Sequence, residues 1–497
     1  MNRKQQDITI IKNYNVLRVT LPPDIPAVAR EVKRLLVAKR KMSERERGKL
    51  RIWLQEEPCY VENIDRENND TFYIIGTGFL DILIDIGNKY SVPVYVLDSN
   101  EPTASDIMRM LPDKDELESM MLRKNQVDIF RSMMMHDRGQ YKAATGMGKS
   151  YLMQMICRVF KNASILLTSY SKRVCAQIHT DLANHGNLDV GLVSGSSRRM
   201  TARVQVCTIG MIDRAYDRVW DIMLLDEKHE CATLKRIAAL MQVKCRAAYG
   251  LSANDGDKQD TSELWLNAIF GPVRSNVTYR EVVQENEVVP VRIHWIRTPV
   301  EQYRPGRLRP GSVHMDRYAL WRNVDRNAEA VRLALKSVAE RGQTMIYVST
   351  IEHALQLRSM VDCPVAIRPQ STEDWNVWEK SGEVPPGMLR PSSNMLGELE
   401  DSFKDGKVRL VIANSVWKRG LNFPHLKTLI RLDGSATMED ATQITGRVNR
   451  PCPGKVDGLV YDFWDVQEPS LLDRSRNRKK AYRDIGYTQE GDTRTVV

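Results

Sequence analysis

The sequence predicts an α/β protein in which two tandem parallel-sheet domains follow a small N-terminal α/β module. Short apolar runs alternate with helical patterns from Leu122 to about Val282, and the same alternation returns after Asp325. Such alternation is typical of a parallel sheet wrapped by helices. The chain has 497 residues, which is too long for one ordinary hydrophobic core. Two or three domains are therefore expected.

The N-terminal module is predicted at residues 1–105, where the pattern differs from that of the rest of the chain. In order, it contains the strand-like ITIIKNYNVLRVTL, a helix from Ile25 to Val37, the strand TFYII, the helix FLDILIDIGNKY and the strand VPVYVLD. The segment SNEPTASD, from Ser99 to Asp106, mixes residues typical of linkers and helix caps. We expect a domain boundary there.

A dense basic run lies inside this module. Nine Lys and Arg residues occur from Lys33 to Arg51, in a stretch that we expect to form one long helix or a helix followed by a loop. Such a cluster could grip nucleic-acid phosphates. Glu44 and Glu46 leave open the alternative of a solvated helix face with i,i+4 ion pairs.

After the boundary we expect a first α/β domain at residues 106–290, a connector at 291–325 and a second α/β domain at 326–497. The strand candidates are ASILLTS, VQVCTIG and WDIMLLD, then TMIYVST, VRLVIANS, HLKTLIRLD and DGLVYDFWD. Residues 363–395 have no usable periodicity, and their role cannot be read from the sequence. The basic tail from Arg474 to Arg483 would either hold duplex phosphates or remain solvated.

Composition and charge indicate a soluble chain with an anionic partner. Hydrophobic residues make up 42% and charged residues 27%, which is a globular balance. Lys and Arg number 73 against 63 Asp and Glu, a formal charge of +10. A basic field attracts polyanions, although a merely soluble basic protein would have the same charge.

The cysteines and the N-terminus indicate a reducing compartment. The eight cysteines form no CxxC pair and no zinc-ligand spacing with histidine, so we interpret them as buried free thiols. The N-terminus MNRKQQDITIIKNYN lacks the apolar core of a signal peptide, and no apolar run is long enough to cross a bilayer. A cytoplasmic location is expected.

The clearest chemical signal is AATGMGKS, from Ala143 to Ser150, between a short strand and a helical pattern. Backbone N–H groups in such a loop surround a phosphate, and the positive end of the following helix adds to the attraction. Gly146 and Gly148 remove side chains that would block the approach. Lys149 supplies charge for the β- and γ-phosphates, and the Ser150 hydroxyl is placed to ligate Mg²⁺. The pattern predicts ATP binding, although its first position is Ala143 rather than Gly.

A pair of acids, Asp226 and Glu227, follows the apolar run of LLDEKHE. Ligands bind at the carboxyl edge of open parallel sheets, so Asp226 is expected to hold Mg²⁺ and Glu227 to activate the attacking water. The alternative is a pair of acids favoured by a helix dipole. His229 would couple this site to the second domain, or would be a hydrogen-bonded structural histidine.

A third element is QITGRVNR, from Gln443 to Arg450. Arg447 and Arg450 are three residues apart and would lie on one face of a helix. Their planar guanidinium groups suit the charge of a transferring phosphoryl group. If the second domain closes on the first, both would reach ATP bound at Lys149. The alternative is a surface helix with ordinary basic residues.

The order of these elements from Leu122 to Asp465 resembles that of the superfamily 2 helicases, whose fold contains two RecA-like domains. The resemblance implies an ATP hydrolase coupled to nucleic-acid unwinding, with ATP and Mg²⁺ as cofactors. DEKH departs from the commoner DEAH and DECH at Lys228, which favours the DExH subgroup.

The resemblance also implies further site residues. It assigns nucleotide contacts to Arg123, Gln126, Thr145, Gly146, Met147, Gly148 and Gly420, with Gln126 reading adenine. It assigns nucleic-acid backbone contacts to Ser169, Tyr170, Ser171, Gln177, Thr208, Gly210, Ser349, Thr350 and Asn414. It assigns coupling of hydrolysis to strand movement to His229, Ser252 and Asn254, and a catalytic place to Gln443 with Arg447 and Arg450. Asn254 and Asn414 stand where the family usually has Thr, and Asn422 where it usually has Asp, which puts the roles of these three positions in doubt.

A narrower resemblance rests on the N-terminal module placed directly before the motor, the DRN from Asp325 to Asn327 and the YDFWD ending. These features are similar to phage recombination helicases, which implies a DNA helicase or translocase that unwinds or branch-migrates forked or branched duplex DNA in replication, recombination or repair, in the host cytoplasm if the protein is of phage origin. An RNA helicase or duplex translocase of the same superfamily, or a P-loop nucleotide-binding protein that unwinds nothing, remains an alternative. Polarity, junction type and oligomeric state do not follow from the sequence.

Overall fold

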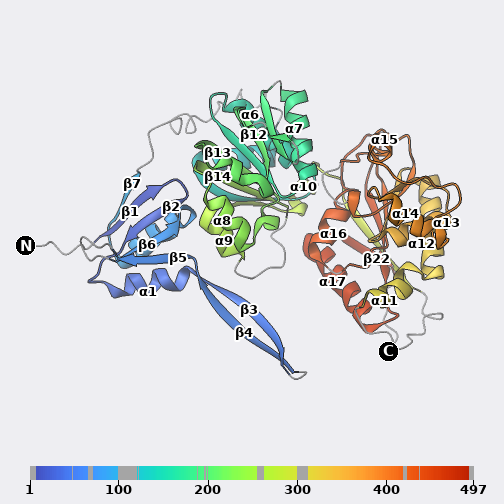
Figure 1. The fold of residues 1–497 in the computed structure, drawn as a ribbon, viewed down its shortest axis with the longest axis horizontal. Coiled ribbons are helices and arrows are strands. Elements are labelled where there is room, and N and C mark those ends of the chain that lie inside the picture. Colours follow the sequence, from blue (N-terminus) through green and yellow to red (C-terminus); the bar gives the residue numbers. More distant parts are fainter. Residues whose placement is uncertain are drawn as a thin grey trace, which may run out of the picture. The chain divides into compact units, whose positions relative to one another are not determined.

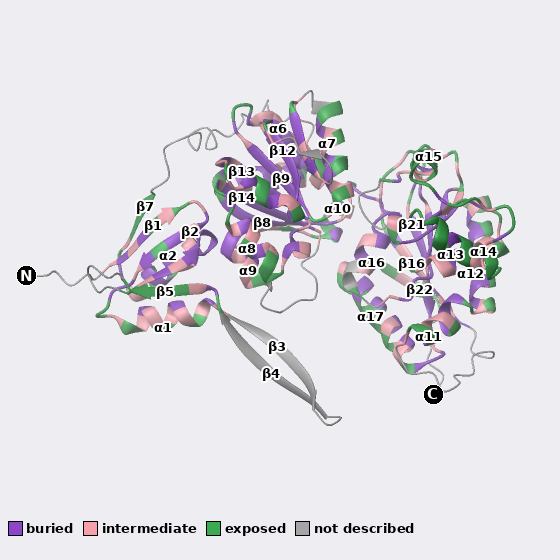
Figure 2. Cartoon of the chain, viewed as in Figure 1, coloured by how far each residue is buried: buried purple, intermediate pink, exposed green. Residues whose placement is uncertain are grey.

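The computed structural model divides the chain into two units. The first unit comprises Met1–Ala144 and Gly148–Val277, and the second comprises Thr145–Met147 and Thr278–Val497. The structure describes residues 7–46, 49–64, 71–98, 120, 122–186, 188–194, 197–198, 200–253, 262–298, 312–417, 422–435 and 437–491. Figure 1 labels the elements along the chain, and Figure 2 shows that the buried residues concentrate on the sheet strands.

The N-terminal module contains a mixed five-stranded sheet in the order β5-β6-β2-β1-β7 (Figure 1). Its elements are β1 (Ile8–Asn13), β2 (Val16–Thr20), α1 (Pro26–Leu35), β5 (Tyr60–Ile64), β6 (Thr71–Gly76), η1 (Thr77–Phe79), α2 (Leu80–Tyr90) and β7 (Val94–Asp98). Successive strand residues face opposite sides of a sheet. The buried face, which includes Ile8, Ile10, Leu17 and Val19, forms one core with the apolar faces of α1 and α2. The predicted strands are present as β1, β2, β6 and β7, and the predicted helices as α1, which ends at Leu35, and α2; β5 was not predicted.

The basic run after α1 is a hairpin, so the helix predicted there is wrong beyond Leu35. Strands β3 (Val37–Glu46) and β4 (Lys49–Pro58) pair antiparallel and form a sheet of their own. Cys59 N donates to Leu36 O at 2.8 Å, which closes the base of the hairpin. Backbone pairing with a partner strand overrides the helical preference of the charged residues, because strand propensity depends on cross-strand context.

The rest of the first unit is an eight-stranded sheet in the order β11-β10-β12-β9-β13-β14-β8-β15, parallel except for β11. Strands β9 (Ile165–Ser169), β12 (Val204–Thr208) and β13 (Trp220–Asp226) are those predicted, and almost every residue in them is buried, as expected when helices cover both faces. The other strands are β8 (Arg138–Ala143), β10 (Val190–Ser194), β11 (Ser197–Arg198), β14 (Cys245–Ser252) and β15 (Val273–Val277). The helices are α5 (Lys124–Met135), α6 (Lys149–Val159), α7 (Lys172–Gly186), η2 (Ile209–Ala215), η3 (Lys228–Cys231), α8 (Leu234–Met241) and α9 (Ser262–Phe270).

The second unit contains a seven-stranded parallel sheet in the order β18-β19-β17-β20-β21-β16-β22. Its strands are β16 (Val291–Arg297), β17 (Thr344–Tyr347), β18 (Val365–Ala366), β19 (Leu410–Ala413), β20 (Thr428–Arg431), β21 (Gly458–Trp464) and β22 (Thr488–Gly491). Its helices are α10 (Tyr279–Gln284), α11 (Val313–Asp316), the π-helical η4 (Arg317–Trp321), α12 (Val324–Glu340), α13 (Ile351–Met360), α14 (Thr372–Lys380), α15 (Ser393–Lys404), η5 (Ser415–Trp417), α16 (Met438–Thr445) and α17 (Pro469–Ile485). The α/β fold with two parallel-sheet domains after a small module is therefore confirmed.

Three segments of the second unit differ from their sequence interpretation. Residues 291–297, assigned to a connector, form β16 inside the sheet between β21 and β22. The stretch at 363–395 contains β18, α14 and the start of α15. The basic tail is part of α17, in which Arg476 and Arg483 are exposed as expected, but Arg478 is 1% exposed and so cannot meet duplex phosphates. Hydrogen bonds to buried partners, described below, offset the cost of burying its charge.

The sequence predicts neither a disulfide bond nor a membrane-spanning helix. None of the eight cysteines is in a disulfide bond; seven are buried and Cys452 is half-buried. Burial raises the pKa of Cys157 and of Cys363 to about 12. Within the described ranges, no helix combines the length and the hydropathy needed to span a membrane.

Candidate nucleotide-binding site

The loop between β8 and α6 has the backbone of a phosphate-binding turn. Gly148 is the N-cap of α6 at φ 92°, and Gly146 has φ 98°, in the left-handed region that glycine adopts without steric cost. A Cβ at Gly148 would lie 2.5 Å from Gln126 Nε2. The loop therefore requires glycine at position 148, and the cradle that it forms fits a nucleotide phosphate at the N-terminus of α6.

Gln126 supports this loop. Its side chain is buried at 2% exposure; Nε2 donates to Gly148 O at 3.3 Å, and Oε1 accepts from Arg123 N at 2.9 Å. The amide thereby ties the start of α5 to the phosphate loop. The reading of adenine by Gln126 remains a prediction.

The predicted catalytic pair lies where β13 ends. Lys149 Nζ is 3.6 Å from Glu227 Oε1, so the structure brings together the loop lysine and the acid expected to act as base. Asp226 is the last residue of β13, and Glu227 follows at φ 51°. A left-handed conformation is uncommon for a residue other than glycine, and such residues concentrate at functional sites.

The electrostatics of Asp226 fit a cation site. Burial and the charge of Glu227 raise the pKa of Asp226 to about 6, while Lys149 acts in the opposite direction. Asp226 Oδ1 is buried and has no hydrogen-bond partner among the residues that the structure describes. A buried carboxylate oxygen without a partner needs an explanation, and Mg²⁺ is a hard cation that prefers oxygen ligands. The site therefore fits Mg²⁺ on chemical grounds.

A histidine joins this pair to the neighbouring strand. His229 Nδ1 lies 2.7 Å from Ser252 Oγ at the end of β14 and 3.5 Å from Glu227 Oε2. Two of the three residues assigned to coupling are therefore in contact with each other. Asn254, the third, lies outside the described residues.

Three strand ends of the first unit meet at one edge of the sheet. In the β12-β9-β13 order, Thr208 pairs with Ser169, and Ser169 pairs with Asp226. The first two belong to the residues assigned to the nucleic-acid backbone. Tyr170 follows Ser169 at 43% exposure, with the Arg236 guanidinium 4.1 Å from its ring centroid. The remaining assigned residues of this unit occupy three positions: Ser171 and Gln177 at and within α7, and Gly210 in η2.

The assigned residues of the second unit follow β17 and β19, which are neighbours in the sheet. Ser349 is exposed, and Thr350 Oγ1 caps α13 by accepting from His353 N at 3.2 Å. Asn414 is buried, and its Oδ1 accepts from Val416 N at 3.1 Å. Thr350 and Asn414 thus have local structural roles. Gly420 lies outside the described residues.

The two arginines of QITGRVNR do not share a helix face, so this part of the interpretation is wrong. Helix α16 contains Gln443 and ends at Thr445, and Arg447 lies in the turn that follows. Arg447 is 6% exposed, with its guanidinium 5.9 Å from the Phe423 ring centroid. Residues 446–449 form turns instead of a further helical turn. The spacing of the two arginines could not reveal where the helix ends.

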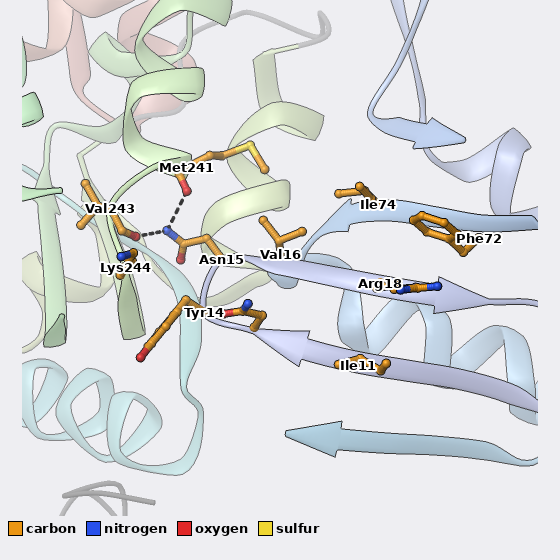
Figure 3. A pocket seen from close by; sticks show the side chains of 11 residues that line it. Ile11, Tyr14, Asn15, Val16, Arg18, Phe72, Ile74, Met241, Val243 and Lys244 are labelled. Carbon is orange, nitrogen blue, oxygen red and sulfur yellow. Dashed lines mark hydrogen bonds between the residues drawn. The ribbon is translucent and has the colours of Figure 1, made fainter. Parts of the chain in front are cut away.

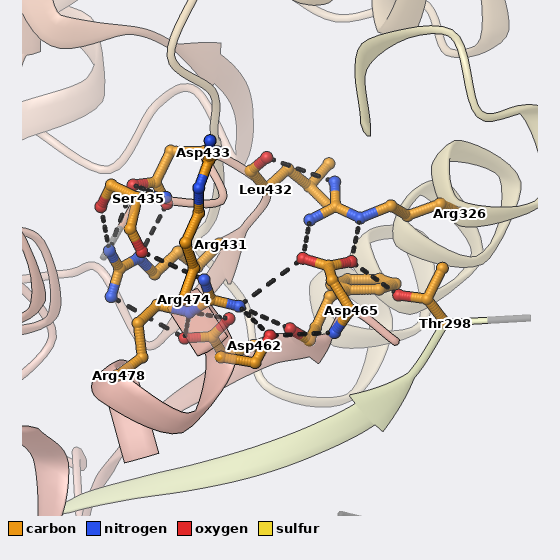
Figure 4. Close-up of polar contacts among 12 residues, drawn as sticks. Thr298, Arg326, Arg431, Leu432, Asp433, Ser435, Asp462, Asp465, Arg474 and Arg478 are labelled. Atoms are coloured by element: carbon orange, nitrogen blue, oxygen red, sulfur yellow. Dashed lines mark hydrogen bonds and ion pairs between the residues drawn. The ribbon is translucent and has the colours of Figure 1, made fainter. Parts of the chain in front are cut away.

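A buried ionic cluster holds the segment that leads into α16 (Figure 4). Arg431 Nε donates to Asp433 Oδ1 at 2.7 Å, and Arg431 Nη2 donates to Ser435 Oγ at 2.6 Å. Arg478 of α17 donates to Ser435 O at 3.0 Å and to Asp462 Oδ2 at 3.2 Å. Burial alone would raise the pKa of Asp433, but the charge and hydrogen bonds of Arg431 lower it overall. The sequence analysis missed this cluster, because nothing in the sequence separates a buried arginine from a surface one.

A second missed residue is Asn449, between the two arginines. It is fully buried, and its Nδ2 donates to Thr145 O at 2.8 Å. Thr145, Gly146 and Met147 group with Asn449 in the second unit. The sequence signal that could have identified Asn449 was its position inside QITGRVNR.

Comparisons with known proteins agree with these features. Residues 326–452 match the family described as helicase conserved C-terminal domain. The DNA 3'-5' translocase XPB2 of Sulfurisphaera tokodaii is 20% identical over 399 residues, which cover 73% of this chain and 86% of that protein. Endoribonuclease Dicer homolog 2b of Oryza sativa subsp. japonica is 34% identical over 91 residues, which are 18% of this chain and only 6% of that protein.

Two solved structures are also similar. Saccharomyces cerevisiae Dbp5 bound to RNA and ADP BeF3 has 16% identity and a TM-score of 0.52, covering 78% of this chain and 96% of that chain. T4 UvsW has 15% identity and a TM-score of 0.42, covering 98% of this chain and 99% of that chain. The chain thus resembles the superfamily 2 helicases, and its residues 326–452 match the helicase conserved C-terminal domain.

Proposed function

We propose that the chain is an ATP-driven motor that unwinds or branch-migrates forked or branched duplex DNA. The observation that carries the proposal is the pairing of Lys149 with Glu227 at 3.6 Å beside the buried Asp226. A phosphate loop, a metal-binding acid and a base are the parts that nucleotide hydrolysis requires. They stand at the carboxyl edge of a parallel sheet, where such ligands bind.

Each residue has a separate role in this proposal. Lys149 binds phosphate oxygens, and Ser150 and Asp226 hold Mg²⁺, which neutralises phosphate charge when bound. Glu227 orients the attacking water and accepts its proton. Arg447 and Arg450 are proposed to stabilise the charge of the transferring phosphoryl group.

The choice of DNA rests on the charge of the chain and on one relative. The formal charge of +10 favours a polyanion, and the named activity of the archaeal relative is DNA translocation. The N-terminal module is proposed to bind the duplex or junction. RNA is the alternative, because Dbp5 has the same fold and was solved with RNA. Contacts with phosphates would make binding tolerant of sequence and sensitive to salt.

The test compares ATP hydrolysis and strand displacement on forks, four-way junctions, plain duplex, single strands and RNA. We expect the largest stimulation with branched DNA. Glu227→Gln should abolish stimulated hydrolysis but retain ATP binding, since only the base is lost. Glu263→Gln, an exposed carboxylate on α9, is the matched control and should behave as wild type. An unchanged rate in Glu227→Gln would remove this residue from the mechanism, and stimulation by RNA alone would reject the DNA proposal.

A further inference from the structure

An open cavity of about 730 Å³ lies where the N-terminal module meets the turn between α8 and β14 (Figure 3). One wall is the face of the module sheet that α1 and α2 leave uncovered. The other wall is formed by residues 241, 243 and 244, which belong to the end of α8 and the turn after it. The nucleotide-binding residues do not line this cavity.

The sheet wall is a flat apolar surface with a cation on an aromatic ring. Ile11, Val16 and Ile74 present apolar side chains, and the Arg18 guanidinium lies 4.1 Å from the Phe72 ring centroid. Arg18 pairs across the strands with Ile74, so planar and apolar groups cover adjacent positions of one surface. Arginine planes and aromatic rings are the groups on which unstacked bases stack.

The cavity is fixed by buried hydrogen bonds rather than by loose packing. The Asn15 side-chain amide donates to the carbonyl oxygens of Met241, at 3.3 Å, and Val243. Arg138 Nη2 donates to Tyr14 O at 3.0 Å and to Asn15 Oδ1 at 2.8 Å. These bonds hold the β1–β2 turn against the eight-stranded sheet, so the two walls keep their spacing.

The charge of the lining selects an anionic ligand. Arg18 and Lys244 contribute positive charge, and no Asp or Glu is among the lining residues. Asp98 and Asp137 each form an ion pair with Lys12, at 3.2 and 3.4 Å. An acidic peptide would satisfy the charge, but it offers few planar faces to the Arg18–Phe72 surface. A nucleic-acid strand supplies both phosphates and planar bases.

We propose that this cavity binds single-stranded nucleic acid by stacking unpaired bases on Arg18 and Phe72. Bases inside a duplex are already stacked and cannot reach such a surface, so the site is specific for unpaired strand. The inference rests on the proposed motor function and adds to it a second strand-binding site outside the motor sheets. There it would retain a strand that the motor separates.

The test uses the full chain and 12-nucleotide oligo(dT) and oligo(U) that carry a photoreactive 4-thiopyrimidine. Crosslinks should map by mass spectrometry to the β1–β2 turn and to β6, and Arg18→Met should weaken oligonucleotide binding about tenfold, as loss of one stacked base predicts. Arg18→Lys keeps the charge but loses the plane, so it should weaken binding nearly as much. Arg34→Met is the matched control, because Arg34 is exposed and paired with Glu31 on α1, away from the cavity. It should bind as wild type does.

Several outcomes would overturn the inference. If Arg18→Lys binds the oligonucleotide with wild-type affinity, positive charge alone accounts for binding and stacking on Arg18 is rejected. Crosslinks confined to the two parallel sheets would reject a nucleic-acid site at the cavity. A co-purifying protein found at the cavity would reject it as well. The ATPase measurement separates this failure from that of the proposed function: hydrolysis that no nucleic acid stimulates rejects the motor, whereas stimulated hydrolysis without crosslinks at the cavity rejects only this site.

Discussion

His229 Nδ1 lies 2.7 Å from Ser252 Oγ, which links the residue two positions after Glu227 to the end of the neighbouring strand β14. We predict that this contact couples the acid pair to β14. Ser252→Ala removes the hydroxyl without leaving a bulky group. We expect ATP hydrolysis within about twofold of wild type and strand displacement reduced about tenfold, consistent with a coupling energy of 1–3 kcal/mol.

The two activities should be measured on the same protein preparation. Ser275→Ala on β15 is the matched control, because it removes a hydroxyl from a strand of the same sheet. Equal losses of hydrolysis and displacement in Ser252→Ala would contradict a coupling role.

A second prediction concerns pH and Asp226. Burial and the charge of Glu227 raise the pKa of Asp226 to about 6 from 3.8, so between these values the folded protein holds a proton that the unfolded chain releases. Stability without metal therefore falls as pH rises through this window. Asp226→Asn cannot ionise, and it should melt at a higher temperature than wild type above pH 6, with the difference vanishing near pH 4.

The measurement is thermal unfolding in a chelator across this pH range. Asp457→Asn provides a control of opposite sign. Burial alone would raise the pKa of Asp457, but hydrogen bonds from Arg341 and Arg292 lower it overall, so its loss should lower the melting temperature at neutral pH and matter less in acid. A lower melting temperature in Asp226→Asn at pH 7 would contradict the prediction.

A third prediction concerns the buried ionic cluster. Arg431→Met leaves Asp433 buried without its partner, which should cost about 3–5 kcal/mol of unfolding free energy. Arg431→Met combined with Asp433→Leu removes both charges and should recover much of that loss. Urea unfolding followed by tryptophan fluorescence would measure both variants. Lys407→Met breaks an exposed pair with Asp405, is the control, and should not shift the urea midpoint. If Arg431→Met also leaves the urea midpoint unshifted, the cluster contributes little to the free energy of unfolding.

A fourth prediction concerns the junction of the module. Asn15→Ala removes the amide that donates to Met241 O and Val243 O. Hydrogen exchange should become faster in β1, β2 and the turn after α8, while ATP affinity stays at the wild-type value, since the phosphate loop is untouched. Exchange that remains slow in all three segments would show that Asn15 does not hold the junction.

The elements that carry strong periodicity could be predicted from the sequence. Strands β9, β12 and β13 are continuous apolar runs, and such runs predict buried parallel strands. The Lys149–Glu227 contact followed from the rule that parallel strands end at one edge. The β3–β4 hairpin could not be predicted, because its residues favour a helix until a partner strand is present. The length of α16 also depended on tertiary context, so the placement of Arg447 was wrong.

The feature that the sequence predicted least well is the burial of charged side chains. Arg326, Arg431 and Arg478 are each 1% exposed or less, yet in the sequence they look like ordinary basic residues. Arg326 Nε donates to Asp465 Oδ1 at 2.9 Å across 139 positions of sequence. No local pattern encodes a pair so distant, and burial of both partners is a property of the folded core alone.

The base of the β3–β4 hairpin has a consequence for engineering. Leu36 and Cys59 are both buried and joined by a backbone hydrogen bond. Between them, the described residues 37–46 and 49–58 share no strand pairing with the five-stranded sheet. The two anchor points are already positioned for a tight turn. We therefore expect that residues 37–58 can be replaced by a short loop, a tag or a hairpin from another protein. The five-stranded sheet should keep its hydrogen bonds when the new segment joins Leu36 to Cys59.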